Sequence, residues 1–213
     1  MEEFQVLILP LLRGLGVTLQ ITAAAALLAL PLALLAGLGR LSRHPWLRWP
    51  ATVYVQVFRG TSALVQLFWF YFVLPLFGLE LPAMAVGIIV LAANTGAYGA
   101  EVVRGAIAAV PAGQREAARA LNMPPALAMR RIVLPQALTA MLPPATNLLI
   151  ELLKNTALVS LITITDLTFS GQLVRSDTLR TTPVFLAVLV LYFIAAQAIA
   201  GVMRLLEKRV AVR

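Results

Sequence analysis

Five long apolar runs dominate this chain and leave it very few possible folds. They cover about residues 16–38, 52–77, 82–103, 137–164 and 183–206. Each run is long enough to cross a hydrocarbon core of roughly 30 Å as a helix, and a helix satisfies its own backbone hydrogen bonds where lipid offers none. Since 61% of the residues are hydrophobic and only 12% are charged, the apolar surface exceeds what a soluble core can hide. We therefore expect an all-α integral membrane protein with about five transmembrane helices.

Length and composition narrow the class further. The 213 residues leave room for a single membrane domain, residues 1–213. The absence of cysteine excludes disulfides, thiolate metal sites and cysteine nucleophiles, and a single histidine excludes a multi-histidine metal site. We therefore expect no bound metal. Glu2 and Glu3 stand where a cleaved signal peptide would have basic residues, so the N-terminus is not expected to be one. We also expect no nucleic-acid partner, because the net charge of +8 is concentrated at the ends of the apolar runs.

The distribution of basic residues predicts the orientation. Arg13, Arg175 and Arg180 fall on one side of the predicted membrane, and Lys154 lies within the fourth run. The other thirteen share the opposite side, and lysine and arginine favour the cytoplasmic side of a membrane. The N-terminus is therefore predicted outside and the C-terminus in the cytoplasm. The thirteen are Arg40, Arg43, Arg48, Arg59, Arg104, Arg115, Arg119, Arg130, Arg131, Arg204, Lys208, Arg209 and Arg213.

Glycine and proline interrupt several of the runs, and two interpretations stay open. Examples are Pro31 and Gly37 in the first run, Gly60 and Pro75 in the second, and Pro143-Pro144 in the fourth. Proline removes a backbone donor and kinks a helix, and irregular backbone lines the aqueous pathways of transporters. Glycine and proline are also common in membrane helices, where small residues allow close packing.

The longest polar interruption, about residues 105–135, is predicted to form two short helices at the membrane surface. Pro111 suits a first helical position, and residues 114–121 are good helix formers. Asn122 follows where the first helix should stop, and asparagine tolerates the left-handed conformation. Pro124 and Pro125 suit the start of a second helix over about residues 126–134. From the residues alone, an amphipathic element lying against lipid is the favoured explanation of this loop.

The same loop resembles a known family. Glu116-Ala117-Ala118 is followed after three intervening residues by Asn122. After nine further intervening residues comes Ile132-Val133-Leu134-Pro135. This pattern is similar to the EAA loop of ATP-binding-cassette importer permeases. That family has glycine where this chain has Asn122, and its members often have serine or threonine where this chain has Met123. Asparagine is the mildest replacement at a left-handed position.

Further motifs extend the resemblance over almost the whole chain. They are similar to the polar amino-acid branch of these permeases, known for histidine, glutamine and arginine uptake. Within this branch the chain most resembles permeases for ectoine and hydroxyectoine. The motifs are Gly16-Val17-Thr18-Leu19, Phe58-Arg59-Gly60-Thr61 with Leu64-Val65-Gln66, Ala97-Tyr98-Gly99-Ala100-Glu101-Val102-Val103-Arg104-Gly105 and Leu153-Lys154-Asn155-Thr156-Ala157-Leu158-Val159-Ser160.

The resemblance implies a subunit of a larger importer in the bacterial cytoplasmic (inner) membrane. A second permease (identical or a sister), two cytoplasmic ATPase subunits and a periplasmic or lipid-anchored solute-binding protein would complete it. The chain itself would not be an enzyme and would bind no cofactor, since ATP and Mg²⁺ belong to the ATPase subunits. Neither of its two lysines ends a glycine-rich phosphate loop.

The resemblance also assigns the cytoplasmic loop a role as the coupling element that contacts the ATPase. Glu116 and Arg119 would make polar contacts there, while Leu121 and Met123 would fill apolar pockets. The residues assigned to this contact are Glu116, Ala117, Ala118, Arg119, Leu121, Asn122, Met123 and Pro124.

Polar residues inside two runs are candidates for binding the solute. Charged side chains at bilayer depth are costly and rarely face lipid. Glu151 and Lys154 share one helix face, and Asn94, Tyr98 and Glu101 share another, so together they offer both charges to a zwitterion. Alternatively, Glu151 pairs with Lys154, and Glu101 with Arg104, for structural reasons alone. The candidates are Asn94, Tyr98, Glu101, Glu151, Lys154, Asn155 and Thr156.

Two other functions are compatible with some of these residues. A stand-alone secondary transporter or channel for small polar solutes also carries intramembrane charges, but has no ATPase to contact and no need of the loop. An intramembrane serine hydrolase would need Ser170-Gly171 as part of its nucleophile motif. Thr168 stands where a rhomboid-like motif needs glycine, and His44, the only histidine, is predicted on the opposite side of the membrane.

Overall fold

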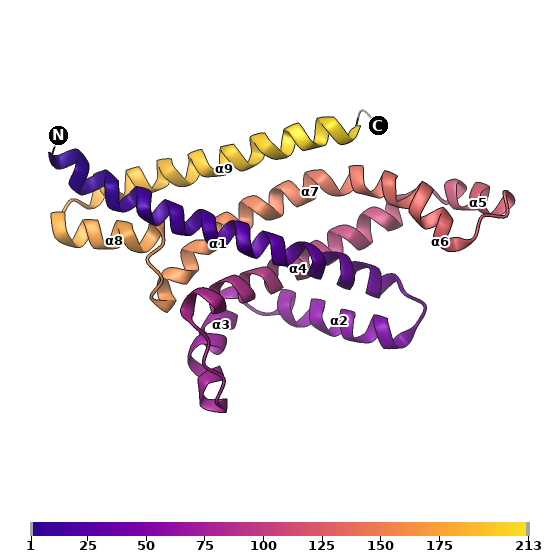
Figure 1. Ribbon diagram of the computed structural model, residues 1–213, viewed down its shortest axis with the longest axis horizontal. Coiled ribbons are helices and arrows are strands. Elements are labelled where there is room, and N and C mark those ends of the chain that lie inside the picture. The colour runs from indigo at the N-terminus through magenta and orange to yellow at the C-terminus, as the bar shows by residue number, and fades with distance from the viewer. Residues whose placement is uncertain (1, 212–213) are drawn as a thin grey trace.

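The computed structural model describes residues 2–211, with the side chains of residues 7–209, and this part of the chain contains helices but no strand. The predicted all-α fold is thereby confirmed (Figure 1). The elements are α1 (Glu2–Leu41), α2 (Pro45–Gly60), α3 (Ala63–Phe68), the π-helix η1 (Trp69–Val73), the 3₁₀ helix η2 (Leu74–Phe77), α4 (Ala83–Ala109), α5 (Ala112–Ala120), α6 (Pro125–Ala128), the π-helix η3 (Met129–Val133), α7 (Leu134–Asn155), the 3₁₀ helix η4 (Thr156–Ile162), α8 (Leu167–Thr178) and α9 (Thr181–Ala211).

Four helical segments of the described chain are long and apolar enough to cross a membrane. They are Leu7–Leu41, Ala83–Ala109, Pro125–Ile162 and Thr181–Arg209, and they lie side by side along the long axis of the molecule (Figure 1). The basic ends of α1, α4 and α9 all lie near α5 and α6, at what we call the loop end. The charge segregation expected from the sequence is therefore present in three dimensions. Arg213 lies outside the described residues, as do the side chains of Glu2 and Glu3.

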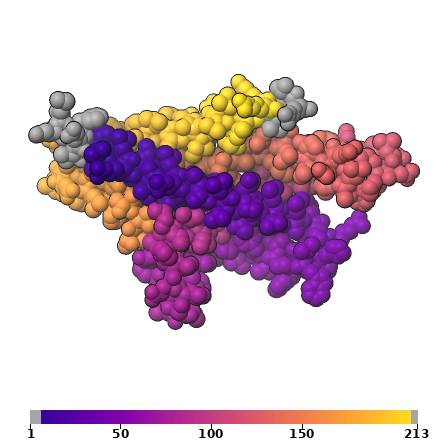
Figure 2. Space-filling view, viewed as in Figure 1, coloured from indigo at the N-terminus to yellow at the C-terminus, as the bar shows by residue number. Residues whose placement is uncertain are grey.

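The second apolar run does not form the single straight span expected from the sequence. Helix α2 ends at Gly60, and the chain turns by 103° into Ala63–Phe77. The segment α3–η1–η2 then stands out sideways from the bundle as an arm, drawn in magenta (Figures 1 and 2). A fifth span exists only if this bent pair counts as one. Gly60 and Pro75, which the sequence singled out as interruptions, thus lie in the run that is broken.

Elsewhere the glycines and prolines do not break the helices. Helix α1 continues through Pro10 and Pro31, and α7 continues through Pro143 and Pro144. Glycine instead lets α1 lie against α4, the most extensive helix contact in the described chain. A Cβ atom on Gly37 would come within 2.7 Å of the Val103 Cβ. Close packing, one of the two interpretations left open by the sequence, therefore explains this glycine.

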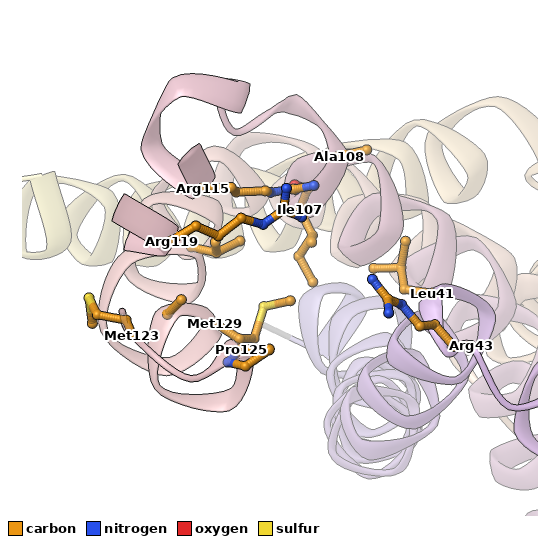
Figure 3. Close-up of a pocket in the computed structure, with 11 residues that line it drawn as sticks. Leu41, Arg43, Ile107, Ala108, Arg115, Arg119, Met123, Pro125 and Met129 are labelled. Carbon is orange, nitrogen blue, oxygen red and sulfur yellow. The ribbon is translucent and has the colours of Figure 1, made fainter. Parts of the chain in front are cut away.

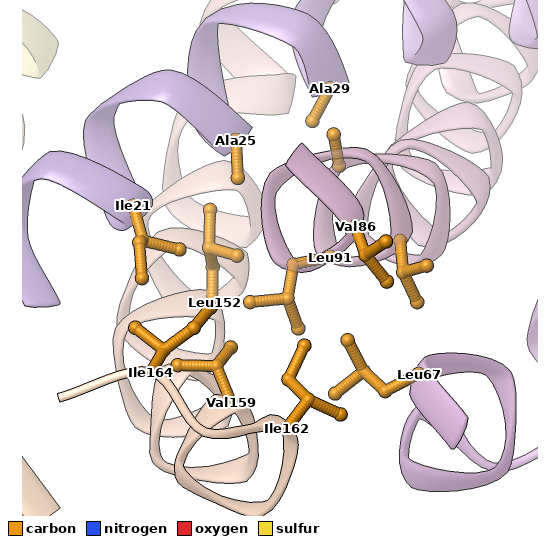
Figure 4. Close-up of a cluster of buried hydrophobic side chains, with 12 residues drawn as sticks. Ile21, Ala25, Ala29, Leu67, Val86, Leu91, Leu152, Val159, Ile162 and Ile164 are labelled. Carbon is orange, nitrogen blue, oxygen red and sulfur yellow. The ribbon is translucent and has the colours of Figure 1, made fainter. Parts of the chain in front are cut away.

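The main core fills the space between α1, α4, α7–η4 and the start of the arm. Ile21 and Ala25 from the middle of α1 meet Leu91, Leu152 and other fully buried side chains there (Figure 4). Besides these residues from the middle of α1, the core contains residues near the start of α4 and residues at the end of α7 and in η4. Leu152 therefore lies level with the middle of α1.

Helix α8 was not expected between the fourth and fifth runs. Buried Asp166 caps its N-terminus by accepting hydrogen bonds from the Phe169 N–H at 2.9 Å and the Thr168 N–H at 3.2 Å. Burial raises the pKa of the Asp166 carboxyl, and the hydrogen bonds from these two N–H groups and the Tyr192 hydroxyl oppose that shift. The helix packs along α1 and α9. An N-cap aspartate was the one signal for this helix in the sequence.

The polar loop differs in part from the predicted pair of surface helices. The first helix is α5, which begins at Ala112, so Pro111 is its N-cap and not its first helical residue. The second helix begins at Pro125, as its proline pair suggested, but α6 and η3 run straight into α7. Pro135 lies near the start of α7, where its missing N–H costs little, so the helix does not break there. The loop is one short helix, a turn and the extended start of a span.

Candidate functional site

The turn after α5 is closed by two backbone hydrogen bonds of the Schellman type. The Met123 N–H donates to the Ala118 carbonyl at 3.0 Å, and the Asn122 N–H donates to the Arg119 carbonyl at 2.9 Å. Asn122 has a φ of +52°, so it adopts the left-handed conformation predicted from its position. This geometry reverses the chain and fixes the angle between α5 and α6.

Helix α5 has two faces with different surroundings. Ala118 is buried and Arg115 is half-buried, so this face turns toward the bundle. Glu116, Ala117 and Leu121 are exposed, and the side chain of Leu121 is 75% accessible. This second face of α5 is therefore open to the surroundings.

The eight residues assigned to ATPase contact do not all face outward. Glu116, Ala117, Leu121, Asn122 and Pro124 are exposed, and buried Ala118 instead anchors the helix. Met123 is half-buried, and both it and Arg119 line a pocket between the loop and the bundle. The structure therefore favours Glu116 and Leu121 over Met123 as the residues available to a partner.

On α4, Asn94 holds the break between α2 and α3. Its amide donates to the Phe58 carbonyl at 3.0 Å and to the Gln66 Oε1 at 3.3 Å. Gln66 in turn donates from Nε2 to the Phe58 carbonyl at 2.9 Å and to the Thr61 Oγ1 at 2.7 Å. These bonds satisfy carbonyls that the end of α2 leaves unpaired. Asn94 was predicted from the sequence to bind the solute, but its amide already donates both hydrogen bonds to the protein.

Further along the same face of α4, Glu101 is the centre of a charged cluster. It forms ion pairs with Arg40 of α1, with Arg59 of α2 at 3.4 Å and with Arg104 at 2.8 Å. The Arg59 guanidinium also lies 5.1 Å from the centre of the Tyr98 ring, within range of a cation–π interaction. The expected pairing of Glu101 with Arg104 is present, but it is one of three. We call these five residues the Glu101 cluster.

On α7, Glu151 and Lys154 are both exposed, and no ion pair joins them among the described side chains. The structural pairing that the sequence left open is therefore absent. Both flank buried Leu152 and Leu153, and Leu152 packs in the main core with Ile21 and Ala25, so they lie level with the middle of α1.

The last two candidates follow at the end of α7. Asn155 is half-buried there. Thr156 is fully buried and donates to the Leu153 carbonyl at 2.7 Å. The hydroxyl of Thr156 thus donates its hydrogen to a backbone carbonyl at the end of its own helical segment.

The structure groups the predicted solute residues in two sets. Asn94, Tyr98 and Glu101 face the α2–α3 break, whereas Glu151 and Lys154 stand on the open side of α7. No hydrogen bond or ion pair is recorded between the sets within the described residues. The sequence did not identify Arg40, Arg59 or Gln66 as site residues, although two of them belong to a motif it noted. Their signal was a polar side chain inside or next to an apolar run.

The described residues hold no group of three or more histidine, cysteine, aspartate or glutamate side chains that could bind a metal ion. Ser170 of α8, considered as a nucleophile, is buried and packs directly against Gly14 of α1. His44 is the N-cap residue of α2 at the loop end, far along the molecule from α8 (Figure 1).

Comparisons with known proteins agree with this fold. The family model described as binding-protein-dependent transport system inner membrane component matches residues 29–212. The probable amino-acid ABC transporter permease protein y4tF of Sinorhizobium fredii is 44% identical over 207 residues, covering 94% of this chain and 87% of that protein. The putative glutamine transport system permease protein GlnP of Rickettsia bellii is 35% identical, covering 99% and 97%. A crystal structure of an amino acid ABC transporter with histidines matches with a TM-score of 0.88 and 36% identity over 94% of each chain.

Proposed function

This chain belongs to the family of binding-protein-dependent transport system inner membrane components, and on that premise we propose that it is the membrane-spanning subunit of an ATP-driven importer of polar amino acids. The observation that carries the proposal is the 44% identity to a probable amino-acid permease over almost the whole chain. The chain is a multi-pass protein of the bacterial inner membrane. A stand-alone carrier or channel is not favoured, because this family works with a binding protein.

In this proposal the loop end faces the cytoplasm and α5 contacts an ATPase subunit. The basic residues gathered at that end support the orientation. The exposed Glu116 and Leu121 on the outer face of α5 would make the contact, and the Schellman turn would transmit its movement to α6 and α7. Because α6 continues into α7, displacement of α5 would be passed directly to the helix that carries Glu151 and Lys154.

Glu151 and Lys154 would face the solute pathway at the contact with a second permease. An exposed acid and an exposed base inside a potential span, level with the middle of α1, would be costly against lipid, which argues for a partner or water on that side. They offer a cation to a carboxylate and an anion to an ammonium group. Asn155 lies beside them at the end of α7, whereas Asn94, Tyr98 and Glu101 would support the pathway from α4 through their contacts with α2.

The partners follow from the same proposal. They are a second permease (identical or a sister), two ATPase subunits that bind ATP and Mg²⁺, and a periplasmic or lipid-anchored solute-binding protein. The solute is proposed to be a zwitterionic amino acid. Ectoine or hydroxyectoine stays a prediction of the sequence resemblance, since the relatives compared above are named for amino acids and glutamine.

The test is ATP-dependent uptake by vesicles that contain the chain with its permease partner, its ATPase subunits and its binding protein. Labelled glutamine, arginine, histidine and ectoine would each be offered. We expect uptake of at least one of the amino acids, and Lys154→Ala and Glu151→Gln to reduce it at least about 10-fold, since each removes a charged hydrogen bond to the solute.

Matched controls are Lys208→Ala in α9 and Glu80→Gln before α4, two exposed residues of the same types outside the pathway. Co-purification of the ATPase subunits reports assembly. Unchanged uptake by the Lys154 and Glu151 variants in assembled complexes would reject the solute site but not the importer. A complex that assembles fully and takes up none of the four compounds would reject the proposed substrate class.

A further inference from the structure

A pocket of about 410 Å³ lies between the polar loop and the loop ends of α1 and α4. This volume is within the roughly 300–1,000 Å³ typical of small-molecule sites. Its wall is formed by three separate parts of the chain: the end of α1 with Arg43, the last turn of α4 with Ile107, and the loop with Arg115 and Arg119. In Figure 3, Arg115 and Arg119 extend from α5 toward Ile107, and Arg43 reaches toward the gap from the opposite side.

The pocket has a strong positive charge and no acid in its wall. Arg43, Arg115 and Arg119 are its charged lining residues. All of the ion pairs recorded for the described side chains belong to the Glu101 cluster, so none of the three arginines is neutralised by a carboxylate. Arg115 donates to the Ile107 carbonyl through one terminal nitrogen, while its buried Nε has no hydrogen-bond partner. Three cations around one space favour an anion there.

The rest of the pocket wall is apolar and lies at the level of the membrane surface. Leu41, Met129 and Val133 line it beside the arginines. Arg43 precedes the first turn of α2, where Trp46 and Trp49 are 88% and 72% exposed. Exposed tryptophans at the end of a membrane helix mark the headgroup layer. A ligand of this pocket would therefore meet both charged headgroups and acyl chains.

We propose that this pocket binds the phosphate headgroup of an anionic phospholipid from the leaflet at the loop end. Arginine pairs with phosphate oxygens in a bidentate manner, and basic pockets between membrane helices bind anionic headgroups. The apolar wall distinguishes this ligand from a free anion, because it suits the start of an acyl chain. An acid from the ATPase is the less favoured occupant, because Glu116 and Leu121, which the proposed function assigns to the ATPase contact, do not line the pocket. The bound lipid links the loop to α1, and this inference is independent of the solute.

The test measures phosphatidylglycerol bound to the full chain, purified in detergent without ATPase subunits, by native mass spectrometry. Phosphatidylcholine is the neutral comparison. The variant Arg43→Gln with Arg119→Gln removes two charges from the pocket and keeps Arg115, whose bond to Ile107 supports the loop. The control, Arg130→Gln with Arg131→Gln, removes two exposed charges from the same segment outside the pocket. Melting temperatures verify that both variants are folded.

We expect selective binding of phosphatidylglycerol that weakens roughly 10- to 30-fold in the pocket variant and stays within about twofold in the control. Equal losses in both variants would overturn the proposal, since the attraction would then be diffuse. Displacement of the lipid by millimolar inorganic phosphate would overturn the lipid as ligand and leave a general anion site. Binding that is equal for both lipids, or unaffected by the pocket variant, would also overturn it.

Discussion

In the Glu101 cluster a single carboxylate forms ion pairs with three guanidinium groups. We predict that Glu101→Gln destabilises the protein, because Arg40, Arg59 and Arg104 would then repel one another at close range. Loss of one partner from a buried pair costs about 3–5 kcal/mol. Since the side chains of Arg59 and Arg104 are 41% exposed and partly screened, we expect about 1–3 kcal/mol. Thermal unfolding in detergent measures this as a melting temperature lower by several degrees.

The control for Glu101 is Glu116→Gln, which removes an exposed acid that forms no recorded ion pair. It should leave the melting temperature almost unchanged. Adding Arg59→Gln to Glu101→Gln should recover part of the lost stability, because one of the repelling charges is then gone. Equal melting temperatures for the Glu101 and Glu116 variants would contradict a stabilising role for the cluster.

Single residues were predictable where the cause was local. Asn122 was expected in the left-handed conformation because it follows a helix and precedes two prolines, and its φ of +52° agrees. The partners of Glu101 could only be seen in part. Arg104 is three residues away on the same helix, but Arg40 and Arg59 come from other helices whose positions depend on the packing of the whole bundle.

The 103° break between α2 and α3 depends on one buried amide. Gln66 donates to the Phe58 and Thr61 carbonyls and to the Thr61 hydroxyl, and accepts from Asn94. We predict that Gln66→Leu destabilises the protein by about 1–3 kcal/mol, because a buried polar group left without its partner costs that much. Gln56→Leu, at an exposed position of α2, is the matched control. Similar melting temperatures for the two variants would show that the break between α2 and α3 does not depend on the hydrogen bonds of Gln66.

At the level of elements, apolar length predicted the number of long helices well. It predicted their shape poorly. Hydropathy is the same for a straight and a bent segment, so it could not show that the second run turns at Gly60, where Gln66 and Asn94 replace the missing helix bonds. The glycine and proline pattern likewise failed to separate α1, which stays continuous, from α2–α3, because close packing against α4 decides the outcome. Helix α8 was missed because it is short and its N-cap residue, Asp166, was the one sequence signal for it.

Two exposed surfaces of the described molecule bear on how it would assemble. The arm formed by α3, η1 and η2 carries Phe72 at 55%, Leu76 at 81% and Phe77 at 72% exposure, and the open side of α7 carries the exposed Glu151 and Lys154. Apolar arm residues alone would be stable in lipid. Glu151 and Lys154 would not, so the two observations together favour a second permease on the side of α7 over lipid contact everywhere.

The orientation of the whole molecule in the membrane can be tested with single cysteines, because the chain has none of its own. Leu121 and Leu179 are 75% and 87% exposed, and they lie in turns at opposite ends of the long axis (Figure 1). If the basic loop end is cytoplasmic, Leu179→Cys in intact cells should react with a maleimide that cannot cross membranes, whereas Leu121→Cys, expressed without the ATPase subunits, should react only in inside-out vesicles. The cysteine-free parent controls for background. The reverse pattern would show that the proposed orientation is wrong. A cytoplasmic ATPase could then not reach α5.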